Sequence, residues 1–538
     1  MVSRIFSYKY ELILVVLTSI LLFSGLNKIE VNIMEARNFT TAREMVQNKE
    51  YLLTTLNGEP RYQKPPLPTW LTALSGSLLG FDSLFALRLP VVLITFLLVF
   101  TLYFLSKRMG LTPVNSFNNS LILITSFYIF FAGRDNQWDM YTHSFMLVSI
   151  FFLWKLLREN KNQITNSLLS GLFLGFSILS KGPVSLYALF LPFIISYIVV
   201  YKIPFKEKWK YLLLMLISGL AIGLSWFAYV RLNDPEYFRL IATREAANWR
   251  NYEVKPFYYY WNFFIQSGLW TIPALIALIY PYLKTKVTNI KEYKFSLIWT
   301  VSSVILLSLI PEKKVRYLVP TLIPMALTTG FYINYLINNF GRSTTKRENI
   351  VVYTSFGIIA SIGIAYPFAM LFVLKELVVD YMFIYITSSI LLLVCTYIIA
   401  TGLVQKEFGK ILYTSIAVFT IAVVSILPIS TKLFTNPNYT TATKVQELEK
   451  RNGIKTYSLS DIAPEIVWNF GKQIPRLNSE QYPSENSFGL LIDASDSSKL
   501  RTFFPNYTTK KLYRVNMHYR KSKKTRLIKD YYLIEKDD

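Results

Sequence analysis

The chain has 538 residues, of which 52% are hydrophobic, 16% are aromatic and only 17% are charged. Soluble domains carry about 25% charged residues, so this composition excludes an ordinary soluble enzyme and a disordered chain. The 57 Lys and Arg outnumber the 33 Asp and Glu and give a formal charge of +24. Because these cations lie between long apolar runs, they indicate membrane lipids and phosphate-bearing partners and argue against nucleic acid.

Apolar runs long enough to cross a bilayer recur through the first 430 residues. A spanning helix needs about 20 mostly apolar residues. Thirteen stretches meet this criterion, near 11–27, 85–105, 116–132, 141–157, 165–180, 184–201, 211–230, 263–283, 294–310, 316–336, 350–374, 380–403 and 411–430. The first lacks a small-residue cleavage site, so we interpret it as an anchor. The sequence predicts an α-helical integral membrane protein with about 13 transmembrane helices.

Lys and Arg are concentrated in alternate loops, which sets the expected orientation. Clusters such as Lys107-Arg108 and the lysines of 202–210 and 284–294 mark one set of loops as cytoplasmic. The opposite set is expected to face the other side of the membrane. It comprises 28–84, 133–140, 181–183, 231–262, 311–315 and 375–379, with the tail from 431.

Loop 28–84 is too long to be a simple connector and is expected to have a function. Residues 35–47 read as an amphipathic helix lying at the membrane interface, with Ala36, Phe39 and Met45 on its apolar flank. Glu35 stands where the first span ends. It is either a capping acid at the surface or a carboxylate that orients or deprotonates a substrate.

Asp139 lies at the mouth of another predicted span, four residues before His143. This spacing allows a hydrogen bond between the two side chains. A lone Asp-His pair is more often a helix-end contact than a metal site. Glu35 and Asp139, on different helices, are expected to project toward one face as a pair of carboxylates.

Several cations fall on the same side as these carboxylates. Lys181, in Lys181-Gly182-Pro183, interrupts an apolar stretch and needs an anion or the interface. Lys313, Lys314 and Arg316 run against the positive-inside trend, so we expect an anion such as a lipid phosphate to offset them. Cations that hold a phosphate beside carboxylates that activate an acceptor suit group transfer from a lipid phosphate.

Residues 431–538 are predicted to form a separate, small soluble domain of α/β or α+β type, after a transmembrane domain over 1–430. Strands are expected at Lys455–Leu459, Phe488–Ile492, Lys510–Val515 and Leu527–Ile534, and a helix at Tyr439–Arg451. The basic stretch Arg520–Arg526 is usually a solvated face, with contact to an anionic membrane as the alternative.

These motifs resemble the polytopic glycosyltransferases of the protein O-mannosyltransferase and lipid A aminoarabinose transferase (ArnT-like) group, which have the GT-C fold. The matching stretches are Glu35-Ala36-Arg37, Ala42-Arg43-Glu44-Met45, Asn57-Gly58-Glu59-Pro60, Lys64-Pro65-Pro66-Leu67, Trp70, Ala86-Leu87-Arg88-Leu89-Pro90, Asp139-Met140, Lys181-Gly182-Pro183 and Arg316-Tyr317-Leu318-Val319-Pro320. Each stretch is weak alone, but they run in family order across residues 30–330.

The resemblance implies a sugar donor linked to undecaprenyl phosphate, and inverting transfer at the periplasmic face of a bacterial inner membrane. It implies lipid A or a protein as acceptor, and a periplasmic C-terminal domain. Glu35 and Asp139 would be catalytic. The donor phosphate would be bound by Arg37, Lys64, Lys181, Arg250, Arg316 and Tyr317. The substrate pocket would include Tyr62, Trp70 and Glu245.

The sequence departs from the family pattern at four positions. One is the family arginine after the Glu-His pair, which has no match in register; Arg250, one place off, is the nearest candidate. Met34 replaces the first acid of the usual Asp-Glu pair, so Asp139 gains weight as the catalytic carboxylate. Gln63 replaces a Glu, and Ala246 replaces the His of a Glu-His pair. In relatives those two positions contribute to a metal site, so their loss argues against zinc. A divalent cation stays open, and no other cofactor is expected.

Three alternative functions predict sequence features that differ from those of a transferase. A transporter or flippase for lipid-linked sugars predicts charges in mid-span and symmetry between halves, and the sequence has neither. A non-enzymatic membrane scaffold would not need the loop motifs. A polysaccharide ligase or polymerase differs by its donor, a pyrophosphate-linked oligosaccharide.

Overall fold

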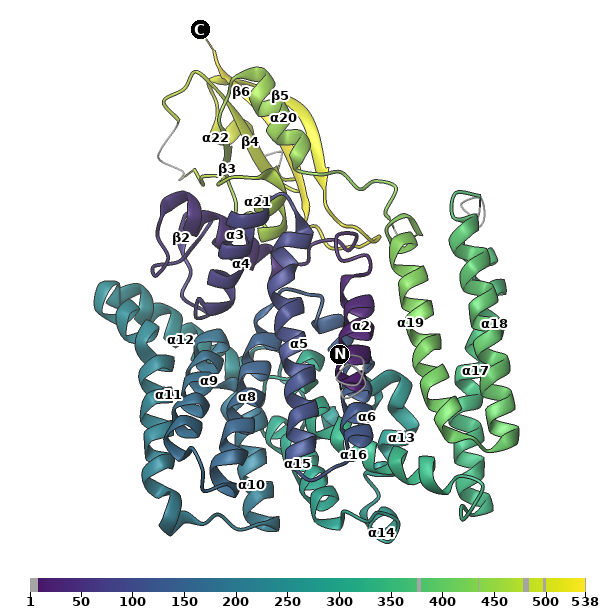
Figure 1. Ribbon diagram of the computed structural model, residues 1–538. Coiled ribbons are helices and arrows are strands. Elements are labelled where there is room, and N and C mark those ends of the chain that lie inside the picture. The colour runs from purple at the N-terminus through teal and green to yellow at the C-terminus, as the bar shows by residue number, and fades with distance from the viewer. Residues whose placement is uncertain (1–7, 375–378, 434, 478–482, 497–499, 538) are drawn as a thin grey trace. The chain divides into compact units, whose positions relative to one another are not determined.

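The computed structural model (Figure 1) describes residues 8–374, 379–433, 435–477, 483–496 and 500–537. The chain divides into two compact units. Unit 1 comprises Met1–Leu26, Gln63–Pro68 and Arg88–Ile429, and unit 2 comprises Asn27–Tyr62, Thr69–Leu87 and Ser430–Asp538. The first long loop and the C-terminal residues therefore belong to the same unit.

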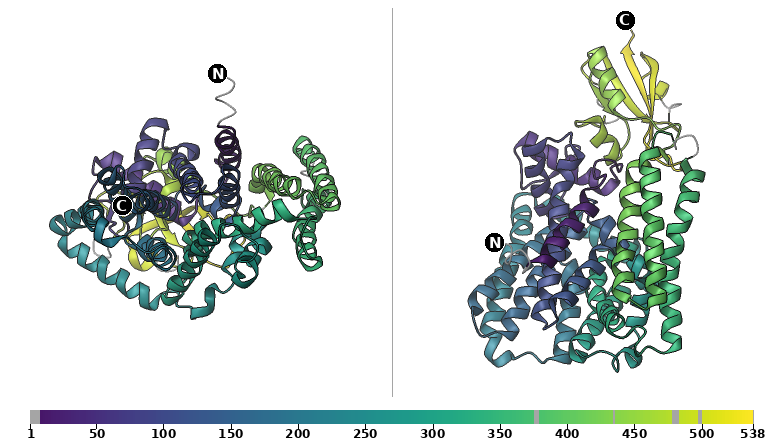
Figure 2. Two further views of the ribbon diagram at one scale, coloured as in Figure 1. Left: turned by 60° about the horizontal axis from the view of Figure 1, so that its bottom comes forward. Right: turned by 45° about the vertical axis from the view of Figure 1, so that its right-hand side comes forward.

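The regular elements of unit 1 within the described ranges are helices, joined by turns, coil and one β-bridge between Val254 and Glu312. Its helices are α2 (Lys9–Phe23), α5 (Leu84–Arg108, which starts in unit 2), α6 (Pro113–Ile124), α7 (Phe127–Ala132), α8 (Trp138–Arg158), α9 (Gln163–Lys181), η1 (Leu186–Phe190), α10 (Leu191–Val200), α11 (Phe205–Asn233), α12 (Pro235–Asn251), η2 (Phe257–Tyr260), η3 (Phe263–Trp270), α13 (Thr271–Ala277), α14 (Tyr280–Leu283), α15 (Ile290–Leu309), η4 (Val315–Leu318), α16 (Val319–Asn339), α17 (Lys346–Leu374), α18 (Met382–Gln405) and α19 (Phe408–Leu433, which ends in unit 2). Figure 2 shows α17, α18 and α19 as a group beside the other helices of this unit.

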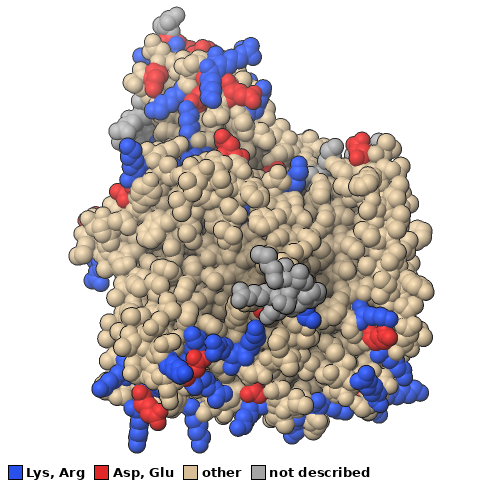
Figure 3. Space-filling model, viewed as in Figure 1, with Lys and Arg blue, Asp and Glu red and all other residues tan. Residues whose placement is uncertain are grey.

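Eight helices within the described ranges are long and apolar enough to cross a membrane: α5, α8, α9, α11, α15, α17, α18 and α19. Their outward faces carry exposed apolar side chains, such as Leu213, Ile217 and Leu224 on α11. In water these faces would be costly, so lipid is their expected solvent. Figure 3 shows Lys and Arg gathered at the lower end of unit 1, below a broad band nearly free of charge.

Two of the predicted spans are not continuous helices. The stretch 116–132 divides into α6 and α7, with Thr125 and Ser126 at the junction. The stretch 263–283 divides into η3, α13 and α14. It breaks at Gly268, whose φ of +57° is outside helical geometry, and a Cβ there would lie 2.2 Å from the ring of Phe127. Apolar content alone did not reveal these breaks.

Close packing fixes α8, α9 and α11 relative to one another. A Cβ on Gly171 of α9 would lie 2.0 Å from the Ser218 hydroxyl of α11, so only glycine permits this approach. Between α8 and α9, the Ser177 hydroxyl donates to the Thr142 carbonyl at 2.6 Å and the Ser170 hydroxyl donates to the Ser149 carbonyl at 2.9 Å. These contacts hold in place the helix ends that carry Asp139 and Lys181.

Unit 2 contains both sheets. Its further elements are α3 (Ile33–Asn48), β1 (Thr55–Leu56), β2 (Glu59–Pro60), α4 (Leu67–Leu79, which starts in unit 1), α20 (Thr443–Asn452), β3 (Thr456–Ser458), α21 (Pro464–Phe470), β4 (Ser487–Asp493), α22 (Leu500–Phe503), β5 (Tyr507–Asn516) and β6 (Ile528–Lys536). The larger sheet has the order β3-β4-β6-β5, with β3 parallel to β4 and the other pairs antiparallel.

The larger sheet is covered on both faces. Along β4, Leu490 and Leu491 point to opposite sides, as strand geometry requires. Leu491 packs with Phe470 of α21, and Leu490 packs with Leu500 of α22. The remaining strands form a hairpin, β1–β2, whose turn residues Asn57 and Gly58 both have positive φ, at 58° and 82°.

Helix α3 is largely buried in unit 2, so most of its apolar flank does not face lipid as the sequence predicted, and its position relative to the membrane interface stays a prediction. The Arg43 guanidinium donates to the carbonyls of Val467 and Trp468 at the end of α21, both at 3.1 Å. Phe39 packs on the Trp468 ring, and Met45 packs in a cluster with α4. Most of the apolar flank of α3 therefore meets protein.

Candidate active site

A buried ion pair joins the ends of α8 and α9. The Lys181 ammonium bonds to Oδ1 of Asp139, and the two residues are only 8% and 2% exposed. Asp139 Oδ2 is buried and has no hydrogen-bond partner among the described residues. A buried acceptor without a partner is rare in native proteins, so Oδ2 is positioned to receive a hydrogen bond from a bound molecule.

The predicted hydrogen bond between Asp139 and His143 is absent from the described structure. His143 Nδ1 is buried without a partner there, and Asp139 bonds to Lys181 instead. A cation is a stronger partner for a buried carboxylate than a neutral imidazole.

Two further predicted residues, Arg316 and Tyr317, approach this ion pair from η4. The Lys181 ammonium lies 5.3 Å from the Tyr317 ring centroid, and the Arg316 guanidinium is close enough to attract the charge of Asp139. Arg316 Nε is buried with no partner among the described residues. Tyr317 donates to Oε1 of Glu312 at 2.9 Å, which fixes its ring.

Lys64 completes the group. It lies close enough to Lys181 for the two charges to repel, and it is ion-paired with Glu245 of α12 at 3.5 Å. Both side chains of that pair are partly exposed, at 25% and 33%. We name Lys64, Asp139, Lys181, Arg316 and Tyr317 the Lys181 cluster; all five were predicted as site residues from sequence. Glu245, predicted to line the pocket, is the partner of Lys64.

The expectation that an external anion offsets all the cations of 313–316 is wrong for two of them. The Lys313 ammonium donates to the carbonyls of Lys255 and Ile310, at 3.0 and 2.6 Å. Lys314 is paired with Glu312 at 2.6 Å. Sequence reasoning did not assign a role to Glu312, although it stands among these cations.

Unit 2 holds a second group of predicted residues, in and after α3. Glu35 is buried in the first turn of α3, where the Asn32 side chain accepts from the backbone N–H of Met34 and Glu35. Burial, and then the nearby charge of Arg37, lowers the pKa of Arg61 to about 9. The charge of the Glu44 carboxylate opposes this lowering.

Arg61 was missed by sequence reasoning, although it directly precedes Tyr62, which was predicted to line the pocket. It is three residues before Lys64 in the chain. Because Glu35 and Asp139 belong to different units, their convergence on one face stays a prediction.

The other residues predicted for the site are Tyr62, Trp70 and Arg250. Tyr62 is buried. The Trp70 indole donates to the Tyr51 carbonyl at 2.7 Å, and its ring lines an apolar groove of about 420 Å³ with Val46 and Leu74 in unit 2. Arg250 lies in α12, and its side chain is outside the described part of the structure.

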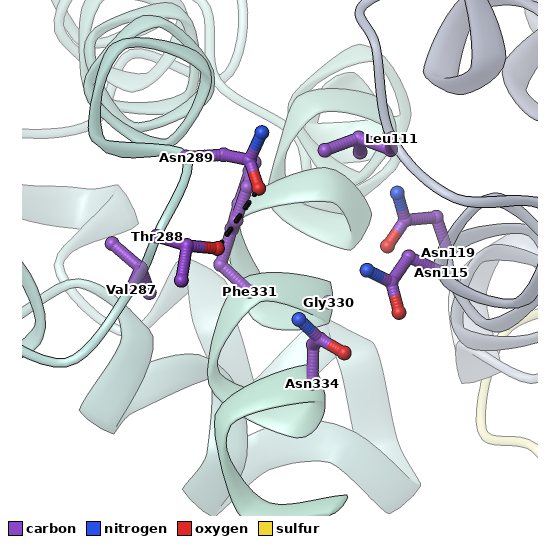
Figure 4. Close-up of a pocket in the computed structure, with 9 residues that line it drawn as sticks. All are labelled: Leu111, Asn115, Asn119, Val287, Thr288, Asn289, Gly330, Phe331 and Asn334. Atoms are coloured by element: carbon purple, nitrogen blue, oxygen red, sulfur yellow. Dashed lines mark hydrogen bonds between the residues drawn. The ribbon is translucent and has the colours of Figure 1, made fainter. Parts of the chain in front are cut away.

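A separate polar pocket lies between α6 and α16, apart from the predicted site residues (Figure 4). Its lining includes four amides, those of Asn115, Asn119, Asn289 and Asn334. Its volume of about 10 Å³ is room for one water molecule, so it is too small for a sugar or a phosphate.

The fold matches that of solved ArnT structures. Crystal structures of ArnT from Cupriavidus metallidurans, bound to undecaprenyl phosphate and in the apo state, superpose with TM-scores of 0.72 and 0.71. Each match covers 98% of both chains at 14% identity. This chain therefore has the ArnT-like GT-C fold, in a helical protein of membrane type.

Sequence comparisons agree with the fold. Residues 63–226 match the family described as dolichyl-phosphate-mannose-protein mannosyltransferase. The chain is 26% identical over 338 residues to the undecaprenyl phosphate-alpha-4-amino-4-deoxy-L-arabinose arabinosyl transferase of Photorhabdus laumondii, and 24% identical over 341 residues to that of Edwardsiella ictaluri. Each match covers 61% of this chain and 60% of the relative, so the chain spans about three fifths of these relatives.

Proposed function

We propose that this protein is a glycosyltransferase that moves a sugar from a polyprenyl-phosphate donor to lipid A. The observation that carries this proposal is the buried pair of Lys181 and Asp139 at the ends of two membrane-spanning helices, with Arg316 near the carboxylate and one carboxylate oxygen without a partner among the described residues. The relatives named above use undecaprenyl phosphate carrying an aminoarabinose, and that donor is our proposal for this chain.

The chemistry divides between phosphate and acceptor. An acceptor oxygen attacks the anomeric carbon opposite the phosphate, and the bond from that carbon to the phosphate oxygen breaks with inversion. The electron pair leaves on undecaprenyl phosphate, whose growing charge Lys64, Lys181 and Arg316 stabilise. Tyr317, whose hydroxyl donates to Glu312, holds its ring beside the Lys181 ammonium, and Arg37 is a further candidate contact.

Asp139 acts on the acceptor side. Its unpartnered Oδ2 is placed to orient an incoming hydroxyl and accept its proton. A phosphate acceptor is already ionised at neutral pH and needs little help from a base. Glu35 is the second candidate carboxylate for this role.

The proposed setting is a bacterial inner membrane with the site at the periplasmic face. It is supported by the loop charges, which predict that the Lys181 cluster lies on the side opposite the Lys-rich loops. The thirteen crossings and a periplasmic domain over 431–538 belong to the same proposal. No resident metal is part of the proposed scheme.

One experiment tests the donor. The purified protein in detergent is given a synthetic polyprenyl-phosphate aminoarabinose and lipid A, and product is measured by mass spectrometry. The variant K64A/R316A should lose at least a hundredfold in rate because two phosphate contacts are removed. K255A, an exposed cation outside the cluster, is the matched control and should keep its rate. Parental turnover by K64A/R316A would refute the proposal.

The acceptor needs a separate readout. Lipid A and glycoproteins from cells with and without the gene are compared by mass spectrometry. A mass shift of one sugar on lipid A alone supports the proposal, whereas a shift on protein alone would assign a protein acceptor instead.

A further inference from the structure

The turn that joins β5 to β6 is strongly basic. Residues 520–526 contain five Lys or Arg and no acid, and all seven are exposed. We name them the basic loop. Arg526 is paired with Glu465 of α21 at 2.5 Å. Lys521, Lys523 and Lys524 make no ion pair with any described residue, so these three positive charges of the loop are available to bind an anion.

The base of the basic loop is tied to the segment that leaves the last membrane helix. The backbone N–H of Asn436 donates to the Tyr519 carbonyl at 2.7 Å, and the Asn436 side chain donates to the His518 carbonyl at 3.1 Å. In Figure 1 the yellow turn between β5 and β6 lies beside the green segment that follows α19.

Covalent reach places this contact near the membrane surface. The apolar span of α19 ends at Ser430, and Asn436 follows six residues later. Three helical steps and three extended steps cover at most about 15 Å. The basic loop is therefore fastened within about 15 Å, in chain length, of the end of a membrane span.

A second contact supports this position. The Tyr439 hydroxyl donates to Oε2 of Glu30 at 3.3 Å, and its ring packs edge-on against Tyr519 at 5.7 Å. Glu30 itself follows the end of α2 by seven residues. Tyrosines are enriched where a membrane protein meets the headgroup layer. Two tyrosines and three free lysines are thus held together beside two chain segments that leave apolar helices.

We propose that the basic loop binds the anionic phospholipid headgroups of the membrane that holds the helices. Exposed lysines at a membrane surface are attracted to lipid phosphates, and the attraction falls off within about one Debye length, which is about 8 Å at physiological salt. The loop would tie the β5–β6 end of the sheet to the bilayer. This function is separate from sugar transfer.

The test places a fluorescent probe in the basic loop of the full chain. Ser522→Cys provides the labelling site, because Cys395, the cysteine already present, is buried. The labelled protein is reconstituted in nanodiscs of phosphatidylcholine alone, or of phosphatidylcholine with phosphatidylglycerol. Both carry a trace of zwitterionic lipid with a nitroxide on its headgroup, which quenches a nearby probe. We expect at least twofold stronger quenching with phosphatidylglycerol, lost in 1 M salt, where the Debye length is about 3 Å.

Two matched variants separate charge from folding. K521Q/K523Q/K524Q should abolish the phosphatidylglycerol effect. K444Q/K450Q/R451Q removes the same charge from α20 and should leave the effect intact. Both should keep the parental unfolding temperature, since these lysines and Arg451 are exposed.

A third lipid composition tests the source of the phosphate. Nanodiscs of phosphatidylcholine with lipid A ask whether the loop selects the acceptor. Quenching that rises with lipid A but not with phosphatidylglycerol would overturn the proposal, as would equal quenching in every composition. A response to phosphatidylglycerol that K521Q/K523Q/K524Q retains would overturn it too.

Discussion

Replacing Lys181 by methionine should destabilise the protein and inactivate it, and a second substitution should restore only the stability. In K181M the apolar side chain fills most of the lysine's volume but leaves the Asp139 carboxylate buried without its ion-pair partner. Loss of one partner of a buried pair typically costs about 3–5 kcal/mol. Arg316 remains near Asp139 and offsets part of this, so we expect about 3 kcal/mol.

The double variant K181M/D139N removes the buried charge together with its partner. A neutral pair of similar shape costs much less than an orphaned carboxylate, so most of the lost stability should return. Activity should stay at least a hundredfold low in both variants, because a phosphate contact is missing from each. Equilibrium unfolding of the protein in mild detergent, followed by tryptophan fluorescence, measures the first effect, and donor turnover measures the second.

Two outcomes would refute this reasoning. K181M could be as stable as the parent, which would mean that the ion pair does not hold the ends of α8 and α9 together. The double variant could be no more stable than K181M, which would mean that the loss comes from packing and not from an uncompensated charge.

Three further predictions follow from the described contacts. R316K should raise the KM for the donor about tenfold at unchanged stability, because an ammonium cannot match the planar guanidinium in binding phosphate, and steady-state kinetics measures this. G171A should lower the free energy of unfolding by about 1–3 kcal/mol, whereas G357A should not, because a Cβ at Gly357 meets open space. Equal unfolding temperatures of the two variants in a thermal scan would contradict this prediction. Burial alone would raise the pKa of Asp530, but hydrogen bonds from Arg514 and Lys511 lower it overall. Its stabilising effect should therefore be full above about pH 4 and fall as the pH drops through the lowered pKa; hydrogen exchange of β6 should show the loss, and D530N should remove the pH dependence.

The sequence predicted where strands lie better than it predicted which distant segments pack together. The expected strands at 455–459, 488–492, 510–515 and 527–534 overlap β3, β4, β5 and β6, because alternation and β-branched residues are local signals. The break of 263–283 was missed, since it depends on Gly268 packing against Phe127, a contact between segments more than 100 residues apart.

At the candidate site, too, the sequence identified the residues but not their contacts. Motif order identified Asp139, Lys181 and Arg316, yet the pairing of Asp139 with Lys181 and of Lys64 with Glu245 depends on tertiary structure. A residue four positions away, His143, was the nearest candidate partner in sequence. The structure pairs Asp139 with Lys181 instead, 42 positions along the chain, because a buried carboxylate needs a cation as its partner.

Long-range contacts of α3 and of the loop that follows it also determine when this part of the chain can fold during synthesis. Arg43 bonds to Val467, 424 residues later, and the Asn57 side chain bonds to both backbone groups of Ile474, 417 residues later. At about 5–20 residues per second, a ribosome needs roughly 20–80 s to travel that distance. Arg43 and Asn57 must therefore wait for these permanent partners until almost the whole polypeptide has been made. A chain that stops before residue 467 would lack the Val467 and Ile474 backbone groups that bind these two side chains.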